Sequence, residues 1–411
     1  MFSLLHVLCV INLDAQDNVW LKMPCNDCGG ARFHDVEFAT PDSGFVASSL
    51  ILYRTIDGGR SWTKLERDDL TRSGIGAISF INGHTGYAGG KELLKTTDSG
   101  ESWISLKDVS GEYTGRHISR LQFISSGFGV AVGDGSLVVY TRDGGLTWRL
   151  GSSGCGTCRS VSIASDTVAY IAGTTQAQQV EAIVERQRKS GQLWSPIPEF
   201  ISAGRLLLQS AMTTLGVGRI WVGGNRLQQQ SRFNQHLVFS SDTGKTWNQP
   251  STVLPAPVTA IAFVDSLMGF VGDEQGDIYR TADGGFTWAR EYKGNAEQPI
   301  KDIAIKGKTI VAVGDYSLIL RRSELVSVAE DVPTNLPTLR LYPNPTTGVV
   351  MVESDLGPAQ FIVVDVLGTV VMQLPAESKT TIDLSAFPPG MYRVMAQTSS
   401  AVRSETVAVV R

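Results

Sequence analysis

The chain has 411 residues, enough for two or three domains with a large hydrophobic core. Its 36 basic and 40 acidic residues give a net charge of −4, so no overall field directs it to nucleic acid or anionic lipid. With 43 glycines and only 18% charged residues, the composition favours many short strands and tight turns over long solvated helices.

The N-terminal sequence MFSLLHVLCVINLDAQD predicts a secretory signal peptide over residues 1–16. An apolar run from Phe2 to Leu13 precedes the small residue Ala15, and it is too short to remain as a membrane anchor. A positively charged start is missing, so a buried first strand is the alternative. No later run reaches about 18 apolar residues, and the sequence therefore predicts no membrane span.

A motif of about ten residues that closes on a tryptophan recurs along residues 17–323, as in YRTADGGFTW at 279–288. Neighbouring tryptophans are 41, 45 and 41 residues apart, with one gap of 99 residues. The degenerate copy ERQRKSGQLW fills that gap, with Lys189 in place of the aspartate and Gly191 retained. The aspartates and tryptophans of the five full copies are Asp57, Asp98, Asp143, Asp242, Asp283, Trp62, Trp103, Trp148, Trp247 and Trp288.

A repeat of 40–45 residues with a glycine and an aromatic landmark is typical of propeller blades. Alternating apolar segments predict four strands in each unit, the second ending on glycine and the fourth starting at the tryptophan. Six copies and a final three-strand unit, IKDIAIKGKTIVAVGDYSLILRRS, predict a seven-bladed β-propeller. The N-terminal segment NVWLKM, with Trp20 matching RSWTKL, is expected to complete the last blade and close the ring.

We interpret the repeated aspartate as a structural residue of a hairpin turn. It accepts backbone N–H groups, a glycine takes the positive φ, and the tryptophan packs between blades. An active-site acid would not be needed five times around a ring and replaced by Lys189 in one copy.

These S/T-x-D-x-G-x-T-W boxes resemble the Asp-box, or bacterial neuraminidase repeat. The repeated unit most resembles the photosystem II stability and assembly factor type of propeller. The resemblance covers residues 17–323 and implies the fold. It implies no single function, because sialidases, xyloglucanases, sortilin-like receptors and assembly factors all use such boxes.

After Ser323 the pattern changes, and ELVSVAEDVPTNLPT predicts a linker over residues 324–337. Residues 338–411 contain alternating apolar segments separated by Asn-Pro, Leu-Gly and Pro-Pro-Gly turns. This pattern predicts a small C-terminal β-sandwich.

The segments YPNPTTG, VVDVLGTVV and PPGMYRV resemble the type A C-terminal sorting domain of the type IX secretion system. The resemblance implies passage through the periplasm, export by the secretion machinery, and release or attachment at the surface of a bacterial outer membrane. An ordinary immunoglobulin-like appendage is the alternative, which explains the strands but not the motif set. The matching positions are Tyr342, Pro343, Asn344, Pro345, Gly348, Asp365, Gly368, Gly390 and Tyr392.

The sequence motifs for catalysis that we considered are incomplete or absent. The GKT at 244–246 lacks the first glycine of a phosphate-binding loop, because Phe239 occupies that position. There is no GxSxG motif, the five histidines lack metal-ligand spacing, and the sialidase-type RIP motif is absent. A xyloglucanase-like enzyme would clamp its substrate between two propellers, and one is predicted here. We therefore assign no catalytic residue, metal or cofactor.

Three further aspartates, Asp134, Asp273 and Asp315, follow a glycine at equivalent blade positions. Paired carboxylates across a cleft could hydrolyse a glycoside. Their recurrence at a turn favours backbone capping instead.

Two cysteine pairs remain after removal of Cys9 with the signal: Cys25 with Cys28, and Cys155 with Cys158. Each is predicted just before the innermost strand of blade 1 or blade 4. A local disulfide in each pair is favoured for an exported chain. A four-cysteine zinc site would join nearly opposite blades, and a redox motif would need a helix N-terminus.

Positive charge also gathers at the start of several innermost strands. In a propeller these positions converge at one end of the central channel, on the face opposite the aspartate turns. They predict an anionic-ligand or partner-binding mouth, with scattered solvated charges as the alternative. The residues are Arg32, His34, Arg116, His117, Arg120, Arg159, Arg205 and Lys301.

The sequence as a whole predicts a secreted or surface-displayed, non-catalytic binding protein that presents a glycan or protein ligand site on a propeller. The alternatives are a glycan-active hydrolase of the Asp-box type and an assembly or chaperone-like factor. A hydrolase should show two facing carboxylates about 5–10 Å apart in a deep cleft.

Overall fold

The computed structural model describes fifteen segments of the chain, which contain strands and no helix. Outside them lie the predicted signal peptide, the linker, Lys189, Gly191, Arg205 and Gly368. The chain divides into two compact units, Met1–Leu325 and Val326–Arg411. The described residues are 19–25, 27–49, 51–65, 74–106, 116–124, 127–175, 182–188, 194–197, 206–216, 218–226, 236–323, 339–354, 357–365, 370–398 and 402–410.

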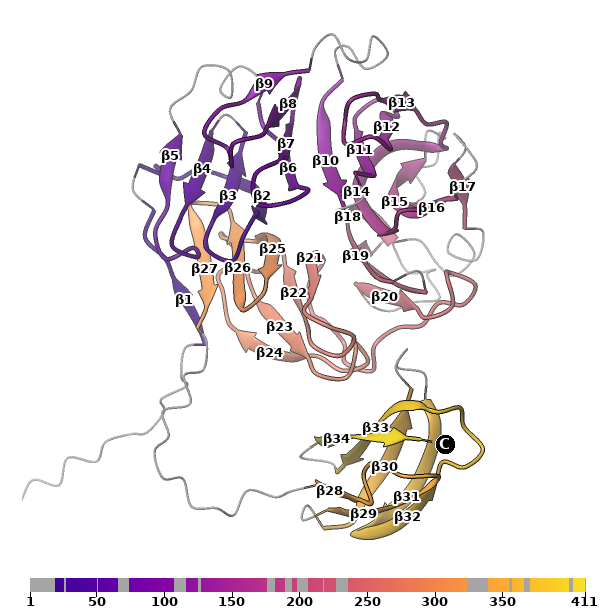
Figure 1. Ribbon diagram of the computed structural model, residues 1–411. Helices are drawn as coiled ribbons and strands as arrows, with labels where there is room; N and C mark the ends of the chain where they lie inside the picture. The colour runs from indigo at the N-terminus through magenta and orange to yellow at the C-terminus, as the bar shows by residue number, and fades with distance from the viewer. Residues whose placement is uncertain are drawn as a thin grey trace, which may run out of the picture. The chain divides into compact units, whose positions relative to one another are not determined.

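The described strands of the N-terminal unit form antiparallel sheets, numbered here 1 to 7 along the chain (Figure 1). Sheet 1 contains β2 (Phe33–Phe38), β3 (Gly44–Ser48), β4 (Leu52–Thr55) and β5 (Thr63–Leu65). Sheet 2 contains β6 (Ala77–Phe80), β7 (Gly86–Gly89), β8 (Leu93–Thr96) and β9 (Ile104–Ser105). Sheet 3 contains β10 (Ile118–Phe123), β11 (Gly129–Gly133), β12 (Val138–Thr141) and β13 (Arg149–Leu150). Sheet 4 contains β14 (Cys155–Ser165), β15 (Val168–Thr175), β16 (Ala182–Arg188) and β17 (Trp194–Pro196).

Sheet 5 has three strands in the described chain, with an isolated bridge from Phe239 to Asn248 beyond the third. Its strands are β18 (Leu206–Leu215), β19 (Arg219–Arg226) and β20 (Leu237–Ser240). Sheet 6 contains β21 (Val258–Phe263), β22 (Gly269–Asp273), β23 (Ile278–Thr281) and β24 (Ala289–Tyr292). Sheet 7 contains β25 (Ile300–Lys306), β26 (Thr309–Gly314), β27 (Leu318–Arg322) and the N-terminal strand β1 (Trp20–Lys22).

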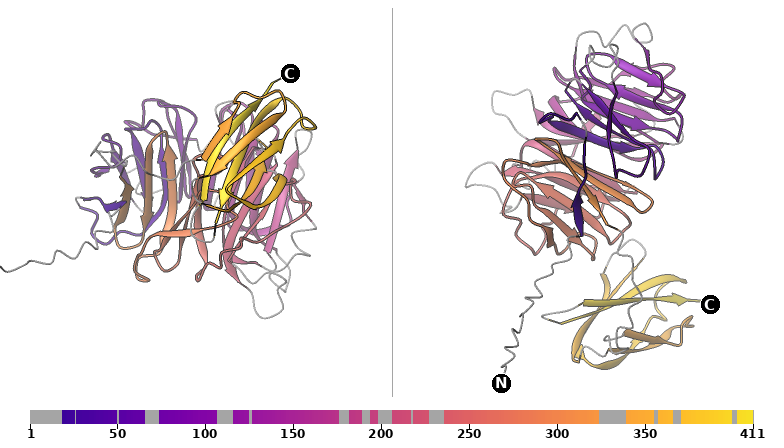
Figure 2. Two further views of the ribbon diagram at one scale, coloured as in Figure 1. Left: turned by 90° about the horizontal axis from the view of Figure 1, so that it is seen from below. Right: turned by 90° about the vertical axis from the view of Figure 1, so that its left-hand side faces the viewer.

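The first strand of each sheet, here called the inner strand, contacts the inner strands of the sheets before and after it. The contacts run from β2 through β6, β10, β14, β18 and β21 to β25, which in turn contacts β2. The sheets stand side by side in Figure 2. Trp20 of β1 pairs with Arg322 of β27, so the N-terminal segment is the outer strand of the last sheet.

Side chains of one inner strand bind backbone N–H groups of the next. Asp302 Oδ2 accepts from Val36 N at 3.0 Å, and Asp35 Oδ2 accepts from Ile78 N at 2.6 Å. Ser79 Oγ accepts from the backbone of sheet 3, and Gln122 Oε1 from that of sheet 4. Each inner strand is the edge of its own sheet, so these bonds satisfy amides that the sheet leaves unpaired.

The repeated aspartates are acceptors within their own turns. Asp283 Oδ1 accepts from Thr281 Oγ1 at 2.8 Å and from Thr287 N at 2.9 Å, and its Oδ2 accepts from Thr287 Oγ1. Trp288 is buried, and its indole N–H donates to Gly285 O. The same carboxylate acceptor pattern occurs at Asp57, Asp98, Asp143 and Asp242. Hydrogen bonds from Ser102 lower the pKa of Asp98 to about 2, which fits a permanently ionised structural acceptor.

The C-terminal unit has two sheets that enclose Val352, Phe361 and Val394 in an apolar core. One sheet contains β28 (Leu339–Tyr342), β29 (Val349–Ser354) and β32 (Lys379–Asp383). The other contains β31 (Val370–Glu377), β30 (Ala359–Val364), β33 (Gly390–Gln397) and β34 (Val402–Val409).

The sorting-motif residues lie at strand ends and turns of this unit. Asn344 Oδ1 accepts from Ala408 N, and Tyr392 OH donates to Pro388 O at 2.8 Å. Both Pro343 and Pro345 follow cis peptide bonds. Tyr342 ends β28, Gly348 precedes β29, Asp365 follows β30 and Gly390 begins β33.

We predict that the Asp35–Asp302 pair makes the N-terminal unit less stable as pH rises. Burial, the charge of Asp302 and a hydrogen bond with its side chain raise the pKa of Asp35 well above the ordinary value. The folded state therefore holds the proton more tightly than the unfolded state, and this stabilisation is lost as pH rises through the folded pKa. Asp302→Asn removes the facing charge and should stabilise the unit by about 1 kcal/mol more at pH 8 than at pH 5.

Urea unfolding followed by tryptophan fluorescence measures this effect, because all eight tryptophans belong to the N-terminal unit. The exposed Asp42→Asn is the matched control and should show no such pH dependence. An equal response of both variants at the two pH values would contradict the prediction.

Candidate functional site

Each of five inner strands contains a β-bulge near its start, and the bulge releases one residue from regular pairing. The pairing register shifts across positions 33–35, 118–120, 158–160, 258–260 and 300–302. A bulge re-aims the side chain of the extra residue. The released residues are His34, Ser119, Arg159, Thr259 and Lys301.

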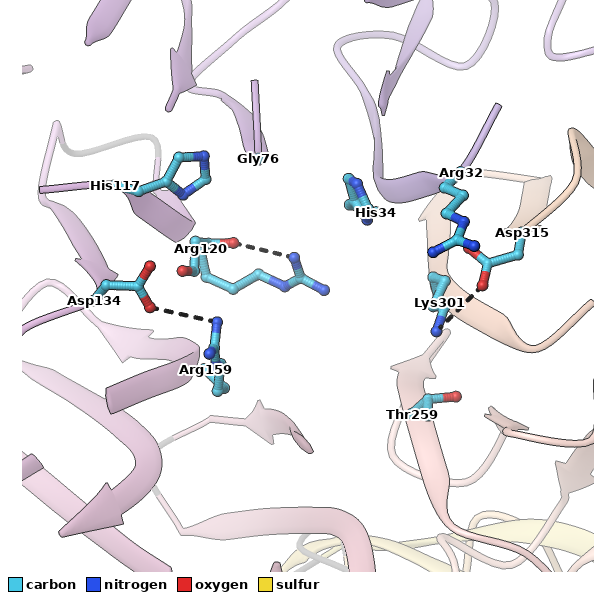
Figure 3. Close-up of a pocket in the computed structure, with 11 residues that line it drawn as sticks. Arg32, His34, Gly76, His117, Arg120, Asp134, Arg159, Thr259, Lys301 and Asp315 are labelled. Atoms are coloured by element: carbon cyan, nitrogen blue, oxygen red, sulfur yellow. Dashed lines mark hydrogen bonds and ion pairs between the residues drawn. The ribbon is translucent and has the colours of Figure 1, made fainter. Parts of the chain in front are cut away.

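All five released residues line one cavity of about 910 Å³, which we call the mouth (Figure 3). Gly76, just before β6, takes the corresponding place in sheet 2, where Ile75 and Ile78 are buried as Phe33 and Val36 are in sheet 1. The complete lining is Arg32, His34, Gly76, His117, Ser119, Arg120, Asp134, Arg159, Thr259, Lys301 and Asp315.

The described lining carries four permanent cations and two carboxylates. Arg159 Nη1 lies 3.6 Å from Asp134 Oδ1, and Lys301 Nζ lies 3.7 Å from Asp315 Oδ2. Arg120 extends from β10 toward the middle of the mouth in Figure 3, where its guanidinium donates to Ser119 O. Among the described residues no carboxylate forms a salt bridge with Arg32 or Arg120, although the charge of Arg120 also acts on Asp35. The lining has two more permanent cations than carboxylates, which is a surplus of positive charge.

A narrower cavity of about 240 Å³, which we call the neck, shares Arg120, Thr259 and Lys301 with the mouth. Its lining includes Asp35, Asp302 and Glu37. Burial is the main cause that raises the pKa of Glu37 to about 7. The neck is thus acidic where the mouth is basic. Asp35 and Asp302 both accept backbone bonds from a neighbouring sheet, which accounts for carboxyl groups at this depth.

His34 is the titratable group of the mouth best placed to report a ligand. Burial and then the charge of Arg120 lower its pKa from the ordinary value, so the imidazole is mostly neutral at pH 7. Its Nε2 lies 2.7 Å from Ser49 Oγ.

The structure brings together six of the eight cationic or histidine positions that the sequence suggested for a mouth. Arg116 is exposed beside Gly135 and is not among the lining residues, and Arg205 lies outside the described residues. The lining sits at the start of the inner strands. The five aspartate turns follow the third strand of sheets 1, 2, 3, 5 and 6 and therefore lie at the opposite end of these antiparallel sheets.

Sequence reasoning missed Gly76, Ser119 and Thr259. A signal exists for them, because the strict alternation breaks where two residues separate buried apolar positions, as in Phe33-His34-Asp35-Val36. Two of the three aspartates interpreted as turn caps, Asp134 and Asp315, pair with cations in the mouth. The third, Asp273, accepts from Gln275 N and Asp277 N within its turn.

Both cysteine pairs form local disulfides, Cys25–Cys28 and Cys155–Cys158. The prediction that each pair precedes an inner strand is wrong for the second pair, because β14 begins at Cys155. Bulges on either side of Cys158 let this strand continue pairing, with Cys155 opposite Thr175. Within the described residues no group of three or more His, Cys, Asp or Glu side chains is arranged to hold a metal ion.

Two family models match parts of the chain. Residues 340–410 match the secretion system C-terminal sorting domain, and residues 15–111 match the photosynthesis system II assembly factor YCF48. The chain therefore combines a type IX secretion sorting domain with YCF48-like propeller repeats, and the sorting domain indicates a secreted or cell-surface bacterial protein. No helix of the described chain has the length and apolarity to cross a membrane.

Solved structures show the fold of the N-terminal unit. A structure of YCF48 bound to D1 peptide has a TM-score of 0.60 and 18% identity, covering 75% of this chain and 97% of its own. YCF48 from Cyanidioschyzon merolae gives a TM-score of 0.52 at 16% identity, covering 74% and 98%. The WD40 β-propeller domain of Doa1 gives 0.53 at 10% identity, covering 73% and 94%. These similarities show a β-propeller; no curated protein matches the chain.

We predict that an anion bound in the mouth raises the pKa of His34, so that binding takes up a proton. Affinity should then rise about threefold as pH falls from 8 to 6. The measurement is fluorescence anisotropy with a labelled hexaglutamate peptide, whose carboxylates stay ionised over this range. His34→Gln should flatten the pH profile.

The control variant is His84→Gln. His84 lies in an exposed turn of sheet 2, where its Nδ1 contacts Ser99 Oγ. A pH profile that His34→Gln leaves unchanged would show that His34 does not face the ligand.

Proposed function

We propose that this protein is a non-catalytic binding protein, displayed at the cell surface or released, whose propeller holds an acidic segment of a partner protein in the mouth. The observation that carries the proposal is the surplus of positive charge. Arg32 and Arg120 line a concave site of about 910 Å³, and neither forms a salt bridge with a carboxylate among the described residues. Such a site attracts anionic groups from a distance and concentrates them.

The scaffold in this proposal is a seven-bladed ring closed by β1. Its support is the sequence of inner-strand contacts, which returns from β25 to β2, and the pairing of β1 with β27. A bond from Val36 N to Asp302 and one from Thr309 Oγ1 to Pro41 O also join the last sheet to the first. A closed ring would leave no free sheet edge to compete with the ligand.

A peptide is a suitable ligand class for this mouth. The described lining has no Phe, Tyr or Trp side chain, so contacts to a ligand would be mainly ionic and hydrogen-bonded. One structurally similar protein, YCF48, has been solved with a D1 peptide bound, which gives a precedent for peptide binding by this type of propeller. An assembly or chaperone-like role would use the same contacts on a client protein.

The carboxyl groups near the mouth do not favour a hydrolase. Asp134 and Asp315 each pair with a cation of the mouth, Arg159 or Lys301, rather than facing one another across a cleft as two hydrolytic carboxyl groups would. The acids with raised pKa values, Asp35 and Glu37, lie in the neck, where Asp35 accepts the backbone N–H of Ile78. Their positions are explained by contacts between sheets.

The proposed route begins with a signal peptide at residues 1–16 and continues through the periplasm to the type IX machinery. The sorting-domain match supports the last step. Release and attachment at the outer membrane are both compatible with this route.

Charge reversal of the mouth should abolish binding. We expect the triple variant Arg32→Glu, Arg120→Glu and Arg159→Glu to bind labelled hexaglutamate at least about tenfold more weakly, because three attractive charges become repulsive. The control reverses three exposed cations of outer strands and loops, Arg149, Lys245 and Lys293. An equal loss of affinity in both variants would refute the mouth as the binding site. Tighter binding of a heparin hexasaccharide than of hexaglutamate would identify an acidic glycan, not a peptide, as the ligand class.

Deletion of residues 338–411 should prevent the protein from reaching the cell surface or medium. The N-terminal unit should then accumulate inside the outer membrane, since that unit is compact and has its own hydrophobic cores. Immunoblots of medium, surface-shaved and periplasmic fractions measure the distribution. Normal export of the truncated chain would contradict the assignment.

A further inference from the structure

We infer that the two disulfides are positioning elements of the mouth: they hold Arg32 and Arg159 in place for the ligand, from two separate sheets. This inference rests on the proposed function. It assigns the cysteines a role in ligand affinity beyond stabilising the segments in which they lie.

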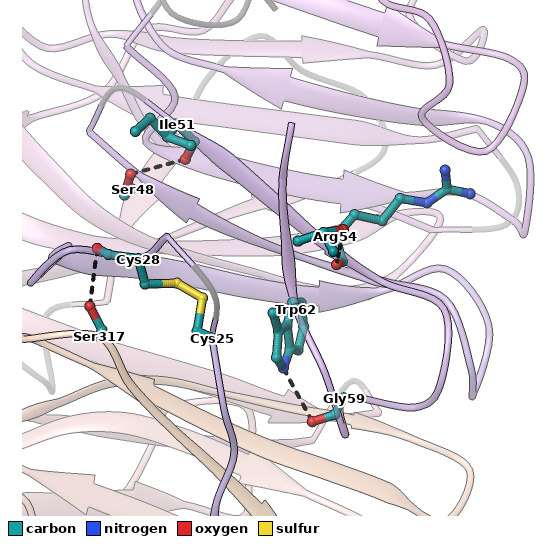
Figure 4. The surroundings of a disulfide bond; sticks show 9 residues. Cys25, Cys28, Ser48, Ile51, Arg54, Gly59, Trp62 and Ser317 are labelled. Carbon is teal, nitrogen blue, oxygen red and sulfur yellow. Dashed lines mark hydrogen bonds between the residues drawn. A yellow bond between two sulfur atoms is a disulfide. The ribbon is translucent and has the colours of Figure 1, made fainter. Parts of the chain in front are cut away.

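The Cys25–Cys28 loop is anchored just before Arg32 (Figure 4). Cys28 is buried, and its carbonyl accepts from Ala31 N at 2.7 Å and from Ser317 Oγ at 3.1 Å. Ser317 N donates to Ala31 O at 2.8 Å. The backbone leading into Arg32 is therefore held by the disulfide on one side and by the turn of sheet 7 on the other.

The Cys155–Cys158 segment, at the start of β14, is also anchored directly before Arg159. Cys155 and Cys158 are fully buried, whereas the Arg159 side chain is 45% exposed. Ser136 N, in the turn of sheet 3, donates to Gly156 O at 2.9 Å, and Gly154 N donates to Glu185 Oε1 at 2.8 Å. Arg159 thus leaves a fixed backbone directly after the second cysteine.

The two sites share one arrangement. In each, a turn of the preceding sheet with the sequence Gly-Asp-x-Ser contacts the disulfide segment through its serine: Ser317 Oγ donates to Cys28 O, and Ser136 N donates to Gly156 O. The aspartate of that same turn, Asp315 or Asp134, lines the mouth. A disulfide, a cation and a carboxylate-bearing turn therefore form one unit, and the unit occurs twice around the mouth.

The need for such anchoring follows from where the two arginines lie. Arg32 precedes β2, and Arg159 is the unpaired residue of a bulge between the paired Cys158 and Ser160, so neither arginine itself has a ladder partner on its own sheet. Arg120 differs, because it pairs with Val132 within the ladder and has no disulfide beside it. Fixing the backbone beforehand lowers the entropy that a long arginine side chain loses on binding.

A double-mutant cycle on the full chain tests the inference. Its members are wild type, C155A/C158A, R159A and the variant with all three changes, and the readout is affinity for labelled hexaglutamate. We expect R159A to weaken binding about three- to tenfold and C155A/C158A to weaken it by part of that factor. In the R159A background, removal of the cysteines should have no further effect.

The cycle separates positioning from stability. A disulfide that acts only on folding would lower affinity equally with and without Arg159, and that result would overturn the inference, as would wild-type affinity in C155A/C158A. If C155A/C158A does not fold, the same cycle on C25A/C28A and R32A decides, because Cys25 and Cys28 lie outside the paired part of β2. Absence of binding by the wild type would instead refute the proposed function.

Discussion

The structure depends on which groups accept hydrogen bonds from the backbone N–H groups on the unpaired edge of each inner strand. Each inner strand pairs with its own sheet on one side only, and it contacts the inner strands of the two adjoining sheets. Carboxyl, hydroxyl and amide oxygens of the preceding strand accept the exposed N–H groups, as Asp302 does for Val36 and Asp35 for Ile78. Burial of carboxyl groups in the neck is a direct consequence, and so is the raised pKa of Asp35.

The mouth follows from the same strands at their other end. A bulge near the start of five inner strands releases one residue from pairing, and these residues lie together in the cavity because their sheets are arranged around it. Lys301 and Arg159 supply charge at two of the positions, and Arg120 extends into the space between. The proposed binding surface is therefore made from irregularities of the scaffold, while the regular aspartate turns of five sheets lie at the opposite end.

Much of this architecture could be predicted, because the repeat spacing and the aspartate turns depend on residues that lie close together in the sequence. Arg32, His34 and Lys301 could be grouped from their positions at strand starts. The bulges could not be located with certainty, so Thr259 and Ser119 were missed, and β14 was expected to begin after Cys158. Links between sheets such as Asp302 to Val36 join residues 266 apart in the chain, and no local pattern reveals them.

The central claim is that the cationic mouth is the place where an acidic peptide binds. A crystal structure of the protein with hexaglutamate bound tests it most directly. The account predicts peptide carboxylates within hydrogen-bond distance of Arg32, Arg120 and Arg159, at the start of the inner strands. Peptide bound at the aspartate turns or on the C-terminal unit, with the mouth filled by solvent, would contradict it.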